Sequence, residues 1–152
     1  MSAVLQGVDI LLVEDSEADA ALVIHVLDAH QPGPSVHVVH DGSEALEFMF
    51  CTGRYAKRDP DQRPSVVLLD LNLPKVSGLE VLQRVKSDPR TLTIPVVILS
   101  SSQSPGDLSR CYRLGANSYL VKETDFAAFS ETLRVAQIYW TRINRPASDA
   151  RI

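Results

Sequence analysis

Residues 66–70 read Val-Val-Leu-Leu-Asp, four apolar residues that lead directly into a carboxylate. Three further short apolar runs have the same design: residues 10–13 lead into Glu14-Asp15, residues 96–99 into Ser100, and residues 119–121 into Lys122. Short runs rich in β-branched residues and separated by helical patterns are typical of parallel strands that are buried on both faces. The sequence therefore predicts an α/β protein built around a parallel sheet.

Helical periodicity and turn residues place one helix after each strand. The expected strands are 9–14, 36–40, 66–70, 95–100 and 117–121, and the expected helices are 16–29, 43–51, 78–86, 105–114 and 125–144. Ser16 and Asp19 have the spacing of a capping box, and Ser43 is expected to cap the second helix. Because crossovers between parallel strands are right-handed, these units predict a doubly wound, five-stranded sheet with helices on both faces, a flavodoxin-like fold. The 152 residues are expected to form a single domain with no output domain.

The polar residues that end these strands form a candidate phosphoryl-transfer site. Sites in parallel sheets lie beyond the carboxyl ends of the strands, so Glu14, Asp15 and Asp70 are expected to gather there with Ser100 and Lys122. Three ionised carboxylates repel one another, and Mg²⁺ is the natural ion to offset their charge. Asp70 would be the nucleophile, while the cation, Lys122 and Ser100 would each stabilise one phosphoryl oxygen. Each residue taken alone is more often a helix cap, a first-turn acid or a solvated lysine than part of a site. The convergence of all of them at the ends of consecutive strands favours a site.

Composition excludes several classes of protein. The net charge of −4 differs from the basic surplus of a general nucleic-acid-binding protein. No apolar run approaches the ~18 residues of a membrane span, and the N-terminus lacks the features of a signal peptide. We therefore expect a cytoplasmic protein that binds neither nucleic acid nor membranes. Cys51 and Cys111 lie in helical patterns and are expected to be reduced, buried thiols.

A polar insert with two prolines occupies residues 53–64. Its basic residues are Arg54, Lys57, Arg58 and Arg63. Two interpretations stay open: a solvated loop, or a docking contact for an acidic partner surface.

Five stretches resemble the receiver domains of two-component response regulators: ILLVEDSEAD (10–19), HDGSEAL (40–46), VVLLDLNLPKVSGLEVL (66–82), IPVVILSSS (94–102) and GANSYLVK (115–122). The resemblance covers about residues 9–144 and identifies the chain as a member of that family. It implies that Asp70 is the phospho-accepting aspartate. It also implies Mg²⁺ bound directly by Asp15 and Asp70, through water by Glu14, and by the backbone carbonyl of Asn72.

The resemblance also implies a conformational switch. Ser100 matches the hydroxyl that moves toward the phosphoryl group, Tyr119 the aromatic residue that swings inward, and Lys122 the lysine that contacts the phosphoryl group. The family lysine is usually followed by a cis proline, whereas Glu123 follows it here, so the bond is either trans or a strained cis bond. Ser101 replaces the usual alanine after the switch hydroxyl.

The finer resemblance is to the small stand-alone receivers of phytochrome-type histidine kinases. It rests on the insert at 53–64, the LNLPK run at 71–75 and the late Tyr139-Trp140 pair. These features imply a phosphoprotein that takes a phosphoryl group from a histidine kinase and signals through a partner. The resemblance therefore predicts a signalling protein that catalyses only its own phosphotransfer and dephosphorylation.

Two other classes of function were weighed. A flavodoxin-like electron carrier would share the order of strands and helices, but the acidic loop at 14–17 would repel the phosphate of FMN. A scaffold that keeps the fold without phosphorylation is the second alternative, and only Glu123 favours it.

The last expected helix carries a heptad-like apolar stripe. Its members are spaced three and four residues apart: Phe126, Phe129, Leu133, Ala136, Trp140 and Ile143. A helix over 125–144 would overshoot the sheet, which predicts a homodimer through Phe129, Leu133, Trp140 and Ile143. The alternatives are that Trp140 packs back on the first helix or that the helix frays near residue 140.

Overall fold

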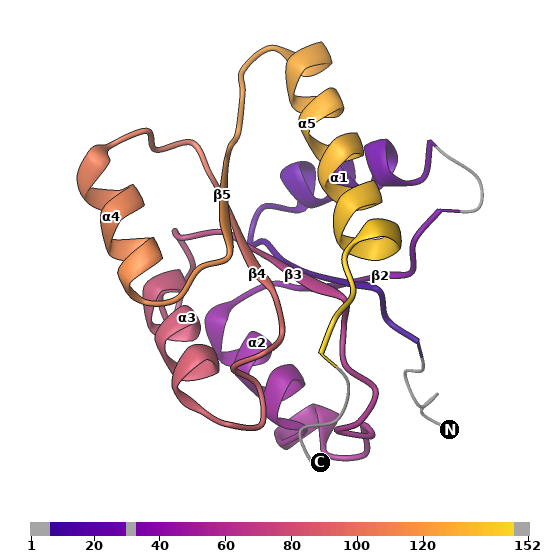
Figure 1. Cartoon of the computed structure of the whole chain (residues 1–152), viewed down its shortest axis with the longest axis vertical. Helices are drawn as coiled ribbons and strands as arrows, with labels where there is room; N and C mark the ends of the chain where they lie inside the picture. The colour runs from indigo at the N-terminus through magenta and orange to yellow at the C-terminus, as the bar shows by residue number, and fades with distance from the viewer. Residues whose placement is uncertain (1–6, 30–32, 148–152) are drawn as a thin grey trace.

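The five strands form one parallel sheet in the order β2-β1-β3-β4-β5 (Figure 1). The structure is a computed structural model that describes residues 7–29 and 33–147. The strands are β1 (Ile10–Val13), β2 (Val36–Val39), β3 (Val66–Leu69), β4 (Val96–Ser100) and β5 (Ser118–Val121). The helices are α1 (Glu17–Leu27), α2 (Gly42–Phe50), α3 (Gly78–Ser87), α4 (Pro105–Arg113) and α5 (Phe126–Ile138), with a 3₁₀ turn η1 (Gly53–Tyr55) and a π-helical turn η2 (Tyr139–Ile143). The predicted fold class and order of elements are confirmed.

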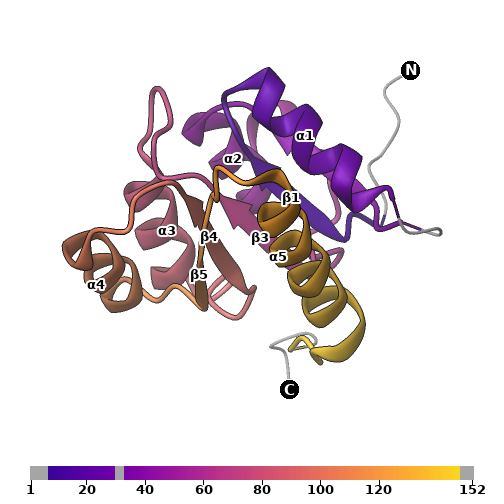
Figure 2. The ribbon, with the colours of Figure 1, turned by 90° about the horizontal axis from the view of Figure 1, so that it is seen from above.

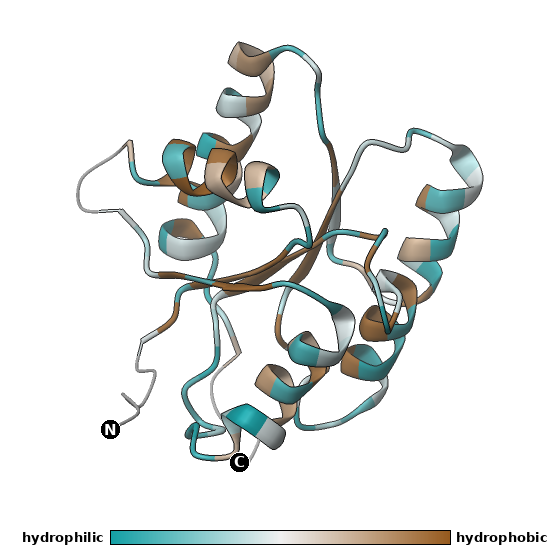
Figure 3. Ribbon diagram, turned by 180° about the vertical axis from the view of Figure 1, so that it is seen from behind, coloured by the Kyte–Doolittle hydropathy of each residue, from teal (hydrophilic) through white to brown (hydrophobic). Residues whose placement is uncertain are grey.

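Helices cover both faces of the sheet. Helices α1 and α5 lie on one face, and α2, α3 and α4 lie on the other (Figures 1 and 2). Successive strand residues point to opposite faces; accordingly Leu11 and Val13 pack with α2 and α3, whereas Ile10 and Leu12 pack with α1 and α5. Every residue of β1, β3 and β4 is buried, which explains why these strands are almost entirely apolar. Figure 3 shows the hydrophobic colour along the sheet.

Side-chain caps set the start of each helix. Ser16 caps α1 by accepting a hydrogen bond from the Asp19 N–H at 3.2 Å, as predicted. The prediction that Ser43 caps α2 is wrong, because Asp41 accepts from the Glu44 N–H at 2.7 Å and the helix begins at Gly42. A Cβ atom at Gly42 would collide with the carbonyl group of Val76, so this close approach requires glycine inside the helix.

The basic insert is held tightly against the body of the protein. Arg54 pairs with Glu47 at 2.8 Å, and Arg58 is only 8% exposed. Lys57 is exposed and makes no ion pair within the described residues. The interpretation of the insert as a wholly solvated basic loop is therefore wrong.

Much of the apolar stripe of α5 is used inside the molecule. Phe129 is 5% and Leu133 1% exposed, and both belong to the core between α5 and the sheet. Trp140 is half-buried and packs against the same core. The prediction of a dimer face is therefore wrong for Phe129 and Leu133, which are buried inside the molecule, while Phe126 and Ile143 are exposed.

The helices of the described residues are short. Within residues 7–29 and 33–147, none combines the length and the apolar character that crossing a lipid bilayer requires.

Candidate functional site

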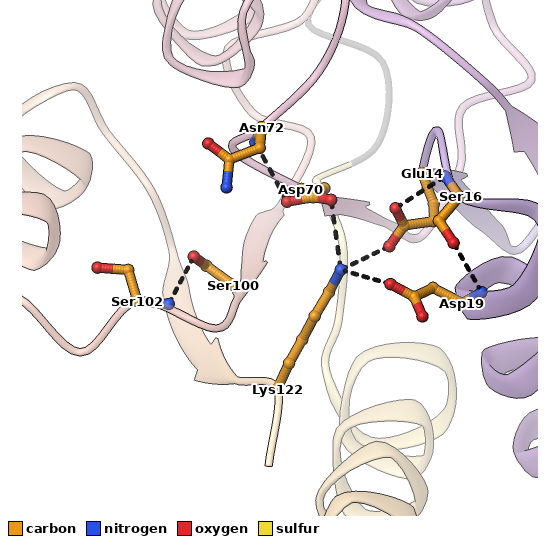
Figure 4. Close-up of polar contacts among 8 residues, drawn as sticks. All are labelled: Glu14, Ser16, Asp19, Asp70, Asn72, Ser100, Ser102 and Lys122. Atoms are coloured by element: carbon orange, nitrogen blue, oxygen red, sulfur yellow. Dashed lines mark hydrogen bonds and ion pairs between the residues drawn. The ribbon is translucent and has the colours of Figure 1, made fainter. Parts of the chain in front are cut away.

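Four predicted site residues meet at the carboxyl edge of the sheet: Glu14, Asp15, Asp70 and Lys122. Figure 4 shows Glu14, Asp70 and Lys122 pointing toward one another. β1 and β3 are paired in register, with Val13 opposite Leu69, and Glu14 and Asp70 are the next residues on each strand. One carboxylate oxygen from each of Glu14, Asp15 and Asp70 lies within 4.8 Å of the other two. The ladder between the strands thus brings together residues that are far apart in the sequence.

Lys122 joins this group from the end of β5. Its Nζ atom lies 2.6 Å from Oε1 of Glu14 and 3.3 Å from Oδ2 of Asp70. The Lys122 N–H of the backbone donates to the carbonyl of Ser100 at 2.8 Å, which fixes the start of the side chain beside β4. Lys122 is therefore positioned to contact a group attached to Asp70.

A fourth carboxylate belongs to the site and was missed by sequence reasoning. Oδ2 of Asp19, in the first turn of α1, lies 3.6 Å from Nζ of Lys122. Its side chain is 53% exposed, so it faces solvent on the outer side of the lysine. The sequence indicated only a capping role for Asp19. Its contact with Lys122 depends on the direction in which α1 leaves β1, which local sequence does not reveal.

The carboxylates are short of positive charge. Glu14 is 1% exposed, and burial raises its pKa from an ordinary 4.5 to about 7 even though Lys122 acts to lower it. Burial alone would lower the pKa of Lys122, but its hydrogen bond to Glu14 and the charge of Asp70 raise that pKa overall. One ammonium group facing several carboxylates cannot satisfy them all, which favours the entry of a further cation.

The donor set fits a hard divalent cation. Mg²⁺ takes oxygen ligands, and it is commonly held by one or two carboxylates together with waters and phosphate oxygens. Asp15 is exposed while Glu14 and Asp70 are buried, so the group is open to solvent on one side. The backbone N–H of Asn72 donates to Oδ1 of Asp70 at 3.2 Å.

The two predicted switch residues, Ser100 and Tyr119, both hydrogen-bond to Ser102. The Ser100 hydroxyl is buried and accepts a hydrogen bond from the Ser102 N–H at 3.1 Å, with no bond to Asp70. The Tyr119 hydroxyl donates to the carbonyl of Ser102 at 2.9 Å, and its ring packs against the core on the α2 and α3 face. Ser100 and Tyr119 are thus close to the site but are bonded to the β4–α4 loop.

The chain belongs to the response regulator receiver domain family, whose model matches residues 10–134. It is accordingly a phospho-accepting receiver of the two-component type, a signalling protein that shares the predicted flavodoxin-like fold. The electron-carrier alternative is set aside by this match.

The relatives place the chain within that family. It is 37% identical to the response regulator Rcp1 of Synechocystis sp. (strain PCC 6803), with 86% of this chain and 87% of Rcp1 covered. A crystal structure of the Mn²⁺-bound form of Rcp1 matches with a TM-score of 0.83 at 35% identity, covering 91% of this chain and 98% of that one. The probable methanogenesis regulatory protein FilR2 of Methanothrix harundinacea is 38% identical, with 93% and 88% covered.

A third relative is known in its phosphorylated state. The crystal structure of the phosphorylated cyanobacterial phytochrome response regulator RcpA matches with a TM-score of 0.84 at 37% identity, covering 91% of this chain and 97% of that one. The chain is therefore related to phytochrome response regulators.

Proposed function

We propose that this receiver accepts a phosphoryl group on Asp70 from the phosphohistidine of a histidine kinase, in a reaction that requires Mg²⁺. The observation that carries the proposal is the meeting of Asp70 with Lys122 and with two further carboxylates at the end of the sheet. Glu14, Asp15, Asp70 and the carbonyl of Asn72 are the proposed metal ligands. A cation held there would neutralise phosphoryl oxygens during transfer.

The protein's own residues orient the reaction. A carboxylate oxygen of Asp70 forms a bond to phosphorus while the bond from phosphorus to the imidazole nitrogen breaks, and the imidazole leaves with the electron pair. The Asn72 N–H, which donates to Oδ1 of Asp70, restricts rotation of the carboxylate. Lys122, 3.3 Å from Oδ2, needs only a small movement to bind a phosphoryl oxygen.

Phosphorylation would change the conformation of α4 and β5 through the hydrogen bonds of Ser102. When the Ser100 hydroxyl turns toward the phosphoryl group, it gives up the hydrogen bond from the Ser102 N–H. Ser102 is also the acceptor for Tyr119 and donates its own hydroxyl to Asp107 of α4. A movement of Ser100 is therefore passed to α4 and β5, which supports Ser100 and Tyr119 as the switch pair.

A phytochrome-type kinase is the proposed phosphodonor. The support is the similarity to RcpA, which is a cyanobacterial phytochrome response regulator, over most of both chains. FilR2 is equally similar in sequence, so identity alone does not select the kinase. Transfer from an autophosphorylated phytochrome kinase, compared with transfer from an unrelated kinase at equal concentration, tests this part of the proposal.

The phosphorylation site is tested with acetyl phosphate and Mg²⁺. Intact-mass measurement should show one added phosphoryl group on the wild type and none on Asp70→Asn. Asp59→Asn, which removes a carboxylate in the exposed insert, should behave as the wild type. Equal labelling of Asp70→Asn would show that another residue is the acceptor, and full labelling in EDTA would show that no metal is needed.

A homodimer through the last helix remains part of the proposal, on a different face. Val135, Tyr139 and Ile143 are 53%, 44% and 61% exposed, and they follow one another at helical spacing. Such a row of large apolar side chains is typical of an interaction surface. Light scattering should give a dimer mass that falls to the monomer mass for Tyr139→Glu. A monomeric wild type at micromolar concentration would refute the dimer.

A further inference from the structure

A cavity of about 310 Å³ lies between the end of α2, the insert and the loop that leads into β4. The volume falls in the range of small-ligand sites. Its entrance and walls combine basic and apolar side chains: Met49, Phe50, Arg58, Arg63, Arg90 and Ile94. None of the residues that line it is acidic.

The guanidinium groups of the cavity are short of carboxylate partners. Arg90 pairs with Asp88 at 2.8 Å. Arg58 and Arg63 have no carboxylate within ion-pair distance in the part of the chain that the structure describes. Burial lowers the pKa of Arg58, although the charges of Cys51 and Asp59 act to raise it. The cavity is therefore a concentrated positive region in a protein of net charge −4.

Arg58 is held in place by contacts that use only some of the N–H donors of its guanidinium group. It is 8% exposed, its guanidinium carbon lies 3.8 Å from the centre of the Phe48 ring, and it donates to the carbonyls of Phe48 and Gln62 and to Sγ of Cys51. A guanidinium has five N–H donors, and these contacts use three of them.

Arg63 is held across the cavity in a similar way. Its two terminal nitrogens donate to Oγ1 of Thr93 at 3.0 Å and to the carbonyl of Arg90 at 2.7 Å. These contacts join the insert to the loop before β4 and leave further donors of the fork without a protein partner. Both guanidinium groups are thus ordered before any ligand arrives, which lowers the entropic cost of binding an anion.

The rest of the wall is apolar. Met49, Phe50 and Ile94 line the cavity together with two prolines of the insert, and the guanidinium of Arg90 lies 5.1 Å from the centre of the Phe50 ring. A bare inorganic ion would leave this apolar surface in contact with water. An anion with a flat or aliphatic body would cover it.

We propose that this cavity binds a small organic anion, a carboxylate or phosphate attached to an apolar body. Arg58 and Arg63 would bind the charged group, and Phe50 and Ile94 would contact the body. The cavity is separate from the phosphoryl-transfer site, because Pro64 and Ile94 precede β3 and β4 whereas Asp70 and Ser100 lie at the far ends of those strands.

The test is a titration followed by two-dimensional NMR, in protein and buffer freed of divalent cations by a chelating resin so that the metal site takes no part. The probes are benzoate, phenyl phosphate, inorganic phosphate and the neutral analogue benzamide. We expect saturable shifts confined to residues 48–64 and 90–94 with benzoate or phenyl phosphate, and none with benzamide. The stronger of the two anions identifies the charged group. Inorganic phosphate binding as tightly as phenyl phosphate would overturn the role of the apolar wall.

Variants distinguish specific binding in the cavity from non-specific electrostatic attraction of anions to the basic insert. Arg63→Gln should weaken benzoate binding at least about tenfold, because a charge-assisted hydrogen bond is lost. Lys57→Gln removes the same charge from an exposed position in the same insert and should bind as the wild type. Ala56→Leu, which places a larger side chain on the wall of the cavity while keeping every arginine, should weaken binding. Equal loss in Lys57→Gln, unchanged binding in Arg63→Gln, or no saturation at millimolar benzoate would overturn the proposal.

Discussion

Substitution of Glu14 by glutamine should stabilise the protein at neutral and alkaline pH when no divalent cation is present. Glu14 is 1% exposed and its pKa is raised by burial from 4.5 to about 7. At about 1.4 kcal/mol per pKa unit, this rise corresponds to about 3 kcal/mol of unfavourable free energy for the charged form in the native state. Glutamine has nearly the same shape without the charge, so we expect a gain of about 2–3 kcal/mol at pH 8.

The pH dependence follows from proton binding. Between about pH 4.5 and pH 7 the native state holds the Glu14 proton and the unfolded chain has released it. The unfolded state therefore binds fewer protons, and the free energy of unfolding of the wild type falls as pH rises through this window. Glu14→Gln lacks this titration, so its advantage should be near zero at pH 4.5 and largest above pH 7.

Urea unfolding followed by circular dichroism at pH 4.5 and pH 8 in EDTA measures both quantities. Glu17→Gln, an exposed acid in the first turn of α1, is the control and should show no comparable gain. Mg²⁺ should stabilise the wild type more than Glu14→Gln, since a bound cation offsets the charge that the variant lacks. A variant less stable than the wild type at pH 8, or a difference independent of pH, would refute the reasoning.

Three further sets of substitutions test the roles of Lys122 and Asp19 at the site and the contribution of α5 side chains to stability. Lys122→Ala should keep the fold in Mg²⁺ and still accept a phosphoryl group, but hydrogen exchange around Tyr119 should no longer respond to phosphorylation. Asp19→Asn should change the rate of phosphorylation by acetyl phosphate by less than about fivefold, because the pair is half exposed, and the change should vanish at roughly 0.5 M salt. Leu133→Ala should lower the free energy of unfolding by about 2–5 kcal/mol in urea, whereas Ile143→Ala, which is 61% exposed, should lower it by less than about 1 kcal/mol.

The sheet and most of the site were predictable because the strands carry a strong local signal. Buried parallel strands are apolar at every position, so the polar residue after each run marks where the strand leaves the core. Glu14, Asp70 and Lys122 each follow such a run, and the parallel arrangement brings them to one edge. Most strand and helix bounds of the structure differ from those expected by one or two residues, but α5 ends at Ile138, six residues before the expected end at residue 144, and the π-helical turn η2 follows it.

The start of α2 was not predictable from cap preferences. Asp41 and Ser43 are both good capping residues, and local sequence does not choose between them. The choice is made by the close approach of Gly42 to Val76, a contact between segments more than thirty residues apart. The reach of Asp19 toward Lys122 likewise depends on tertiary geometry.

The stripe on α5 shows where periodicity is ambiguous. Over fewer than twenty residues, a heptad repeat and the repeat of an ordinary amphipathic helix place the same residues on one face. Phe129 and Leu133 fit both repeats, and in the structure they are buried in the core between α5 and the sheet of the same molecule. The burial of Arg58, by contrast, could not be predicted at all, because nothing in a polar, basic loop indicates which arginine becomes buried.

The hydrogen bond between Lys122 and Glu14 has a consequence for the order of events during folding. It joins residues 108 positions apart, so it can form only after β5 has been added to the edge of the sheet. Contacts between such distant residues carry a large loop-closure cost and form late. A nascent or partly folded chain therefore lacks the contact between Lys122 and the carboxylates at the end of the sheet. If Asp70 accepts the phosphoryl group as proposed, the switch operates only in molecules in which β5 has joined the sheet.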